Sequence, residues 1–327
     1  MTRALITGLT GQDGSYLAEQ LAALGWEVHA LVRGRVAVGD SSAKSPILHV
    51  GDLMDLARIV RVLDEVEPDV VFNLGGISSV ATSWHRPVDT GLISGIAVVA
   101  LLEAAAKLQT RTGRAVRFVQ ASSSEIFGDA SQVPQTESTP IAPVSPYGMA
   151  KAYGHQAVSI YRSKGLHASA CILYNHESPR RPDSFVTRKI TAGAAQIAAG
   201  KLDRLMLGNL DLKRDWGWAP DYVDALVRAA DASAPGDYVI ATGQSHSIRE
   251  FAAAAFSAVG IEDWENRIGI DQRFVRPADP HDMLGDASKA RDVLGWAPTV
   301  DFEEIVARMA AHDVELLREK GVGPIGS

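Results

Sequence analysis

The sequence is almost free of cysteine, because Cys171 is the single thiol among 327 residues. One cysteine permits no disulfide within the chain, which favours a reducing compartment, and we expect a cytoplasmic location. Cys171 falls in the apolar run 168–173, so we expect it to be a core residue.

The sequence also lacks a cationic, apolar leader, and no apolar run looks long enough to span a bilayer, so we expect no membrane association. It has no basic block: 32 Lys and Arg stand against 39 Asp and Glu, with a net charge of −7. This balance argues against a nucleic-acid partner, although local arginines can still bind a phosphorylated ligand. We find no internal repeat and predict no metal site. With 46% hydrophobic residues, the chain is typical of a globular protein with a large core.

A glycine-rich loop lies near the start of the chain, between an apolar strand (3–7) and an amphipathic helix (15–24). Three glycines spaced three apart permit a tight turn, close approach to a pyrophosphate, and close packing of helix on strand. The pattern predicts a dinucleotide site, with an ordinary loop as the alternative. The residues expected to hold the cofactor here are Gly8, Gly11, Gln12, Asp13 and Gly14.

The second predicted strand (27–32) is followed by Arg33 and Arg35 and lacks the terminal acid that would bind a ribose 2′-hydroxyl. This favours NADP, unless both arginines are simply solvated. Strand 47–53 brings Asp52 toward an adenine edge, although Asp52 could equally cap the following helix. Strand 69–74 leads into small residues over which a dinucleotide can pass. From these two segments we predict further cofactor contacts at Asp52, Leu53, Leu74 and Gly75.

A hydroxyl-rich segment follows the apolar strand 115–119, and a helix over 145–164 comes after it. Tyr147 and Lys151 are four residues apart and share one helix face, where the ammonium can lower the phenol's pKa. Such a pair beside Ser123 can move a proton to or from an alcohol oxygen. Alone, the pair could be a surface tyrosine and a solvated lysine, but the strand, the hydroxyls and the nucleotide loop favour chemistry.

The order of these segments predicts an α/β protein with a Rossmann-like, doubly wound parallel sheet and a smaller C-terminal substrate domain. We place the dinucleotide-binding domain at residues 1–174 plus about 215–242, and the substrate domain at 175–214 and 243–327. Helices 87–107 and 145–164 are rich in Ala, Val and Leu. Such helices often pair between subunits, although burial within one chain would produce the same composition.

Over nearly its whole length the sequence resembles the extended short-chain dehydrogenase/reductase family and, more narrowly, GDP-mannose 4,6-dehydratases. The glycine loop and the Tyr-x-x-x-Lys pattern are common to the wider family, and other segments are more specific. The resemblance rests on residues 7–17, 122–125, 145–147, 175–181, 185–190, 207–211 and 214–216.

The resemblance implies a catalytic set of Ser123, Glu125, Tyr147 and Lys151, with Ser123 at a position where the family usually has Thr. It implies a redox-neutral conversion of GDP-mannose to its 4-keto-6-deoxy product with recycled NADP. A 4-epimerase or a keto-sugar reductase would have no use for Glu125, and a non-catalytic dinucleotide sensor is the remaining alternative. Implied contacts to the nucleotide sugar fall on Ser78, Asn175, Lys189, Arg214 and Arg276.

Three departures from the family concern specificity and assembly. Ile77 and Ser79 replace a Gln and a His of the substrate-facing loop, and Gly75-Gly76 replaces two alanines. The loop after Arg33 looks shorter than the one that joins subunits in the family. We therefore expect a homodimer, with a homotetramer as the alternative.

Overall fold

The computed structural model describes residues 1–34, 45–274 and 282–319, and every structural statement below concerns these residues. Two of the predicted ligand-binding arginines, Arg35 and Arg276, lie outside the described residues.

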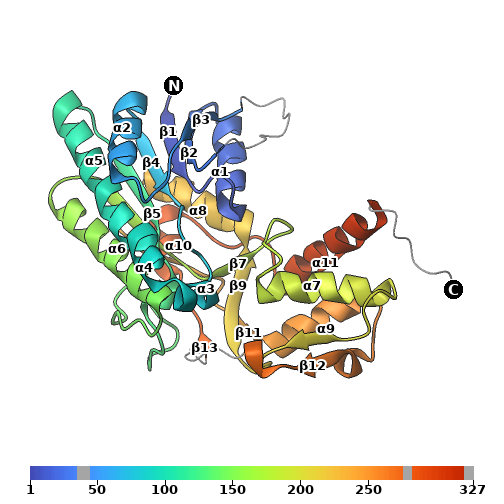
Figure 1. The fold of residues 1–327 in the computed structure, drawn as a ribbon. Coiled ribbons are helices and arrows are strands. Elements are labelled where there is room, and N and C mark those ends of the chain that lie inside the picture. Colours follow the sequence, from blue (N-terminus) through green and yellow to red (C-terminus); the bar gives the residue numbers. More distant parts are fainter. Residues whose placement is uncertain (35–44, 275–281, 320–327) are drawn as a thin grey trace.

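A seven-stranded sheet forms the centre of the fold, with all neighbouring strands parallel and in the order β10-β6-β5-β4-β1-β2-β3 (Figure 1). This confirms the predicted fold class. The strands follow the apolar runs closely and span Arg3–Thr7 (β1), Glu27–Val32 (β2), Ile47–Val50 (β3), Val70–Asn73 (β4), Arg117–Ala121 (β5), His167–Leu173 (β6) and Asp237–Ile240 (β10).

Helices cover both faces of this sheet because successive side chains of a strand point to opposite faces. In β1, Ala4 and Ile6 join the core cluster on one face, whereas Leu5 joins the cluster on the other. The first face is covered by α1 (Gln12–Ala23), α8 (Ala219–Asp231) and α10 (Ser288–Leu294); the second by α2 (Leu56–Val66), α5 (Ala97–Thr112) and α6 (Pro146–Ser163).

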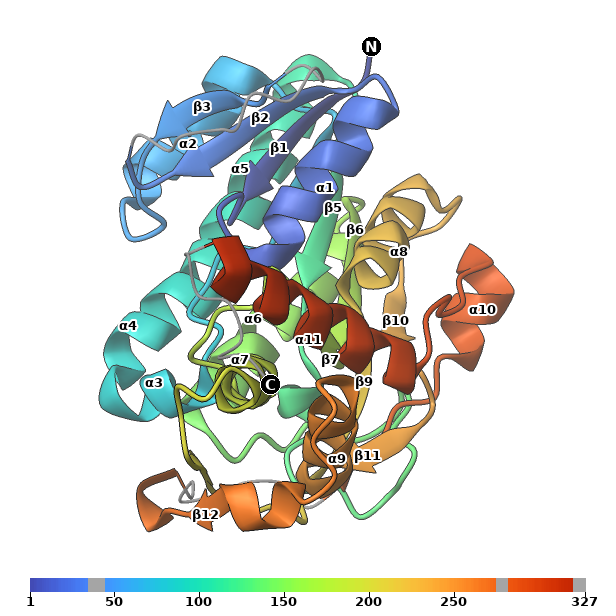
Figure 2. The same ribbon diagram turned by 90° about the vertical axis from the view of Figure 1, so that its right-hand side faces the viewer.

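A second lobe lies beyond the sheet, as Figure 2 shows. Its own sheet has the order β11-β9-β13, with β7 pairing with β9, and β8 pairs separately with β12. Three helices pack into a third core cluster with these strands. The elements are β7 (Asn175–Glu177), α7 (Val186–Ala198), β8 (Leu205–Leu207), β9 (Lys213–Trp218), β11 (Ser245–Ser247), α9 (Ile248–Ala258), β12 (Ile268–Ile270), β13 (Asp282–Met283) and α11 (Phe302–Glu319).

One continuous helical stretch is longer than the sequence indicated. It runs from Pro87 to Thr112 through α4 (Pro87–Gly91), a π-helical turn (Leu92–Ile96) and α5. By length and composition it could cross a membrane, so the expectation that no apolar run is long enough was wrong. Half of its most apolar window is buried, and α5 contributes to the core between α2 and α6, which is typical of a core helix.

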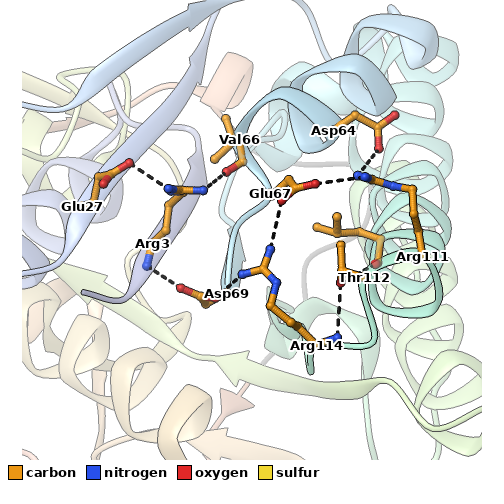
Figure 3. Close-up of polar contacts among 10 residues, drawn as sticks. Arg3, Glu27, Asp64, Val66, Glu67, Asp69, Arg111, Thr112 and Arg114 are labelled. Atoms are coloured by element: carbon orange, nitrogen blue, oxygen red, sulfur yellow. Dashed lines mark hydrogen bonds and ion pairs between the residues drawn. The ribbon is translucent and has the colours of Figure 1, made fainter.

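The amino ends of the strands are joined by half-exposed ion pairs (Figure 3). The Arg3 guanidinium donates to Glu27 at 3.0 Å, and its backbone N–H donates to Asp69 at 2.8 Å. Arg114 bridges Asp69 and Glu67, each at 3.2 Å. These contacts fasten the ends of β1, β2 and β4 to the end of α2. The network continues outward through Arg111 and Asp64.

The carboxyl ends of the central strands are joined by neutral, buried side chains instead. Thr7 on β1 donates its hydroxyl to the Asn73 Oδ1 atom on β4 at 2.6 Å. The Asn73 amide donates in turn to Gln120 Oε1 on β5 at 2.8 Å. This Thr7–Asn73–Gln120 ladder leaves few unsatisfied polar groups at the end of the sheet that faces the second lobe.

Candidate active site

A cavity of about 540 Å³ lies between the carboxyl ends of the sheet and the second lobe. The loops after β4 and β5, the first turns of α6, and β7, α7 and β9 all contribute to its wall. It brings together ten of the predicted site residues: Asp13, Leu74, Ser78, Ser123, Glu125, Tyr147, Lys151, Asn175, Lys189 and Arg214.

Tyr147 and Lys151 reach this cavity because α6 begins just before them. Ser145 caps the helix by accepting the Gly148 N–H at 3.0 Å, and Pro146 occupies the first turn. The Lys151 ammonium lies 5.7 Å from the centre of the Tyr147 ring and donates to the Ala121 carbonyl at 2.8 Å. Both side chains are buried, at 8% exposure each.

Burial dominates the electrostatics of this pair. It raises the pKa of Tyr147 to about 12, although a hydrogen bond with Ser123 acts in the opposite direction. It lowers the pKa of Lys151 to about 8. The expected lowering of the phenol's pKa is therefore not found, because loss of hydration outweighs the hydrogen bond that favours the phenolate. The cavity alone therefore favours the neutral phenol of Tyr147, so its action as a base requires further positive charge near the phenol.

Ser123 and Glu125 follow β5 in a short 3-10 turn. The Glu125 backbone N–H donates to Ser123 Oγ at 3.3 Å, which holds the Ser123 hydroxyl against the backbone of Glu125. A methyl group at Gly148 would come within 2.5 Å of the Glu125 carbonyl oxygen. The glycine thus allows the Glu125 backbone to lie against the first turn of α6, and the Glu125 carboxylate acts electrostatically on Tyr147.

The glycine loop fits a dinucleotide pyrophosphate. Gly8 has a φ of +81°, and a Cβ at Gly14 would fall 2.1 Å from the Gly8 carbonyl oxygen. Both positions therefore require glycine. No side chain caps the amino terminus of α1 at Gly11, so its first-turn N–H groups are oriented to receive an anion.

The remaining predicted cofactor contacts follow β2, β3 and β4. Arg33 is exposed at the end of β2. Asp52 accepts the Met54 N–H at 2.9 Å, whereas α2 is capped by Asp55, so the alternative role of Asp52 as that helix cap was wrong. Leu53 packs on the core, and Gly75 donates to the Thr7 hydroxyl at 2.9 Å.

The predicted sugar-nucleotide contacts that belong to the described residues all line this cavity. Asn175 lies on β7, and Ser78 precedes α3 (Val80–His85). The Lys189 ammonium on α7 lies 3.4 Å from the centre of the Phe274 ring. Arg214 on β9 is buried and donates to the Lys213 carbonyl at 2.7 Å. Charged and amide donors thus gather where a nucleoside diphosphate would need them.

Sequence reasoning missed several cavity residues as individuals. His176 and Arg181 belong to the polar segment 175–181, whose density of polar groups was the available signal. Trp84 and His85 come from α3, a six-residue helix that the sequence did not predict. Phe274 follows from neither composition nor spacing, because only the fold carries it to Lys189.

A parallel sheet that presents Tyr147, Lys151 and Ser123 at one cavity beneath a second lobe places the protein among the extended short-chain dehydrogenases/reductases. A family model described as GDP-mannose 4,6 dehydratase matches residues 5–309. The chain belongs to this family, and the predicted resemblance is confirmed.

Relatives from plants, animals and bacteria support the assignment over nearly the full length. The chain is 42% identical to GDP-mannose 4,6 dehydratase 1 of Arabidopsis thaliana, covering 98% of this chain and 91% of the relative. It is 42% identical to the Homo sapiens GDP-mannose 4,6 dehydratase, covering 96% and 92%. For a GDP-mannose 4,6-dehydratase of Vibrio cholerae the identity is 40%, covering 96% and 94%.

Solved structures agree on the fold. A UDP-glucose 4-epimerase of Thermus thermophilus, in complex with NAD, superposes with a TM-score of 0.82 at 26% identity, covering 95% of this chain and 99% of the other. A UDP-glucose 4-epimerase of Thermotoga maritima, with UDP-glucose, gives a TM-score of 0.85 at 22% identity, covering 97% and 100%.

Proposed function

We propose that the protein dehydrates GDP-mannose to GDP-4-keto-6-deoxy-mannose with an internally recycled nicotinamide dinucleotide. One observation carries the choice of reaction: Glu125 is held against the first turn of α6, close enough to influence the pKa of Tyr147. An epimerase or a reductase needs Ser123, Tyr147 and Lys151 but no carboxylate at this position. Family membership supports the same choice.

The chain's residues would divide the proton transfers. Tyr147 would accept the proton of the sugar's 4-hydroxyl as a phenolate, which the positive charges of Lys151 and of a bound nicotinamide would favour, and Ser123 donates a hydrogen bond to the developing 4-keto oxygen. The ketone acidifies carbon 5, whose proton Glu125 removes. The same carboxyl then protonates the departing 6-hydroxyl, which leaves as water. A bound dinucleotide would supply the redox chemistry, accepting hydride from carbon 4 and returning it to carbon 6, and the proton that Tyr147 received would then be available to restore the C–H bond at carbon 5.

For the cofactor we propose NADP in particular. Arg33 lies at the end of β2, where a 2′-phosphate would meet a cation instead of the acid that selects NAD. Asn175, Lys189 and Arg214 would hold the nucleotide sugar. We also propose two domains: a dinucleotide-binding domain of residues 1–174 plus about 215–242, and a substrate domain of residues 175–214 and 243–327.

A homodimer is our proposal for the assembly. The helices α4 to α6 leave apolar side chains exposed on their outer surface, which a second copy would cover in a four-helix bundle. They are Val88, Leu92, Ile96, Met149, Tyr153 and Ile160. Light scattering at micromolar concentration should give twice the mass of the chain, and a monomer would contradict the proposal. The lone, buried Cys171 supports a cytoplasmic location.

The function is tested by incubating the purified protein with GDP-mannose and NADP in deuterated water. We expect a 4-keto-6-deoxy product that carries deuterium at carbon 5, because that proton is removed and replaced during elimination. No net reduced dinucleotide should accumulate. A product epimerised at carbon 4, or net oxidation of the sugar, would refute the dehydratase.

A further inference from the structure

The first helix is fastened along its length to the segment that opens the second lobe. At its inner end, Gln12 donates to the His176 carbonyl at 3.0 Å and accepts the Ser178 hydroxyl at 2.8 Å. At its outer end, Arg180 donates to Ser15 at 3.0 Å and pairs with Glu19 at 2.8 Å. The cofactor loop and the wall of the sugar site therefore share a direct contact.

An ion pair lies at the inner end of this contact. The Asp13 carboxylate, in the first turn of α1, is 3.0 Å from His176 Nε2. The other ring nitrogen, Nδ1, lies 2.7 Å from the Tyr174 carbonyl oxygen. Since both neighbours are acceptors, His176 satisfies them together only as an imidazolium that donates from both nitrogens.

The pKa shifts agree with this geometry. Burial acts to lower the pKa of His176, but the charge and hydrogen bond of Asp13 raise it overall. Burial acts to raise the pKa of Asp13, but His176 lowers it overall. Removing either charge would leave the other buried and unpaired. The other groups that face the pair are Tyr147, Lys151, Tyr174, Glu177, Arg181 and Tyr222, whose ring centre lies 4.6 Å from that of His176.

His176 also determines where the neighbouring cavity residues lie. It occupies the middle of β7, between Asn175 and Glu177, in register with β9. The buried Glu177 carboxylate lies 3.1 Å from the Arg181 guanidinium and accepts the Thr187 hydroxyl at 2.7 Å. A shift of His176 would therefore move the Asn175 and Arg181 side chains that line the cavity.

We propose that the Asp13–His176 ion pair is a positioning contact that couples the two ligand sites, so that filling the dinucleotide loop tightens nucleotide-sugar binding and the reverse. Coupling between two sites is reciprocal in binding free energy. The pair acts through the geometry of β7 and of the first turn of α1. This inference rests on the proposed function, because it takes guanosine diphosphate as the sugar-side ligand.

The test measures the Kd of GDP by calorimetry, with and without saturating NADP, in the full chain. We expect NADP to tighten GDP binding at least about fivefold in the unmodified protein, the lower range of typical coupling. Asp13→Asn, which is nearly isosteric, should reduce this factor to about one, and so should His176→Gln. Arg180→Gln is the matched control, because it breaks only the outer contacts and should keep the coupling.

A pH series on the unmodified protein supplies a test that needs no variant. A base whose pKa is raised by its partner is protonated at low pH and loses the contact as the pH rises through the raised value. The coupling should therefore be full below the usual histidine pKa of about 6.5 and disappear above the raised value. Asp13→Asn should abolish this dependence.

The outcomes separate the inference from the function. If GDP binds but NADP leaves its affinity unchanged in the unmodified protein, or if Asp13→Asn keeps the coupling, the inference is overturned and the dehydratase stands. Loss of coupling in Arg180→Gln to the same extent would also overturn it, since a merely structural interface would respond in that way. If GDP does not bind under any condition, the proposed function falls and the inference with it.

Discussion

Neighbouring strands of the central sheet are joined by side-chain contacts at both ends, but the contacts are charged at the amino ends and neutral at the carboxyl ends. At the amino ends, Arg3, Asp69 and Arg114 use charges that remain about half exposed. At the carboxyl ends, Thr7, Asn73 and Gln120 use neutral groups that are almost fully buried. Arg3 lies on β1 with Thr7, whereas Asp69 and Arg114 precede β4 and β5, the strands that carry Asn73 and Gln120.

The difference between charged and neutral contacts follows from the surroundings of each end of the sheet. Exposed ion pairs remain hydrated and each contributes little to stability. They can therefore join strand ends where water is present. Beside the cavity, an additional charge would alter the electrostatic field that Lys151 and Glu125 produce. The neutral Thr7–Asn73–Gln120 ladder forms its hydrogen bonds without adding such a charge. Burial then raises the pKa of Tyr147 and lowers the pKa of Lys151, and such large shifts are typical of functional sites.

The largest effect is expected from Tyr147→Phe at the carboxyl end. Removing the phenol leaves no group to accept the 4-hydroxyl proton, and loss of a general acid or base costs up to about 10⁴ in rate. Reduced dinucleotide should not form even in a single turnover, which rapid absorbance measurement checks. Binding of NADP should persist, and formation of reduced dinucleotide at the unmodified rate would contradict the role.

Asn73→Ala should cause the largest loss of stability. It leaves the Thr7 O–H without its acceptor and the Gln120 amide oxygen without the donor that Asn73 provides, and both groups are buried. Each unpaired group costs about 1–3 kcal/mol. Urea denaturation should show the lower free energy of unfolding, and a loss no greater than that of an exposed ion pair would refute the contrast between the two ends.

Arg33→Asp sharpens the comparison at the edge of the cofactor site. We expect the unmodified protein to prefer NADP over NAD by at least tenfold, about 1.4 kcal/mol in binding. The substitution should shrink or invert this preference, because a carboxylate repels a 2′-phosphate and accepts a 2′-hydroxyl. Equal Kd values for the two cofactors in the unmodified protein would refute the NADP assignment.

The smallest effect belongs to Arg114→Ala at the amino end. This arginine bridges Glu67 and Asp69, but its side chain is 49% exposed. We expect a loss of about 0–1 kcal/mol in unfolding free energy, and less at high salt. Catalytic rates should stay unchanged. A loss comparable to that of Asn73→Ala would show that the exposed network is more important than its exposure indicates.

Sequence patterns predicted most of the sheet because each strand is a short apolar run bounded by turns. Tyr147, Lys151 and Ser123 could be predicted for the same reason, because their spacing and their place after a strand follow from local structure. The direction of the pKa shift of Tyr147 could not be predicted, because it depends on how much water the assembled cavity excludes.

Long-range contacts explain the other differences. The Asp13–His176 pair joins residues 163 positions apart, and the local sequence of neither residue indicates the other as its partner. The helix of residues 87–112 was predicted to end at 107, but it continues for five further residues, of which Leu108 is buried in the core. The segment 175–181 was recognised as polar, but the role of each member depends on its register in the second sheet.

The dehydratase proposal depends most on Glu125, and one measurement tests it directly. Glu125→Gln, which is nearly isosteric, is mixed with GDP-mannose and stoichiometric NADP in a single turnover. Oxidation at carbon 4 should survive while elimination slows by about 10²–10⁴. Reduced dinucleotide and a 4-keto sugar that retains its 6-hydroxyl should therefore accumulate. Formation of the 6-deoxy product at the unmodified rate would show that Glu125 is not the acid and base, and would contradict the proposed reaction.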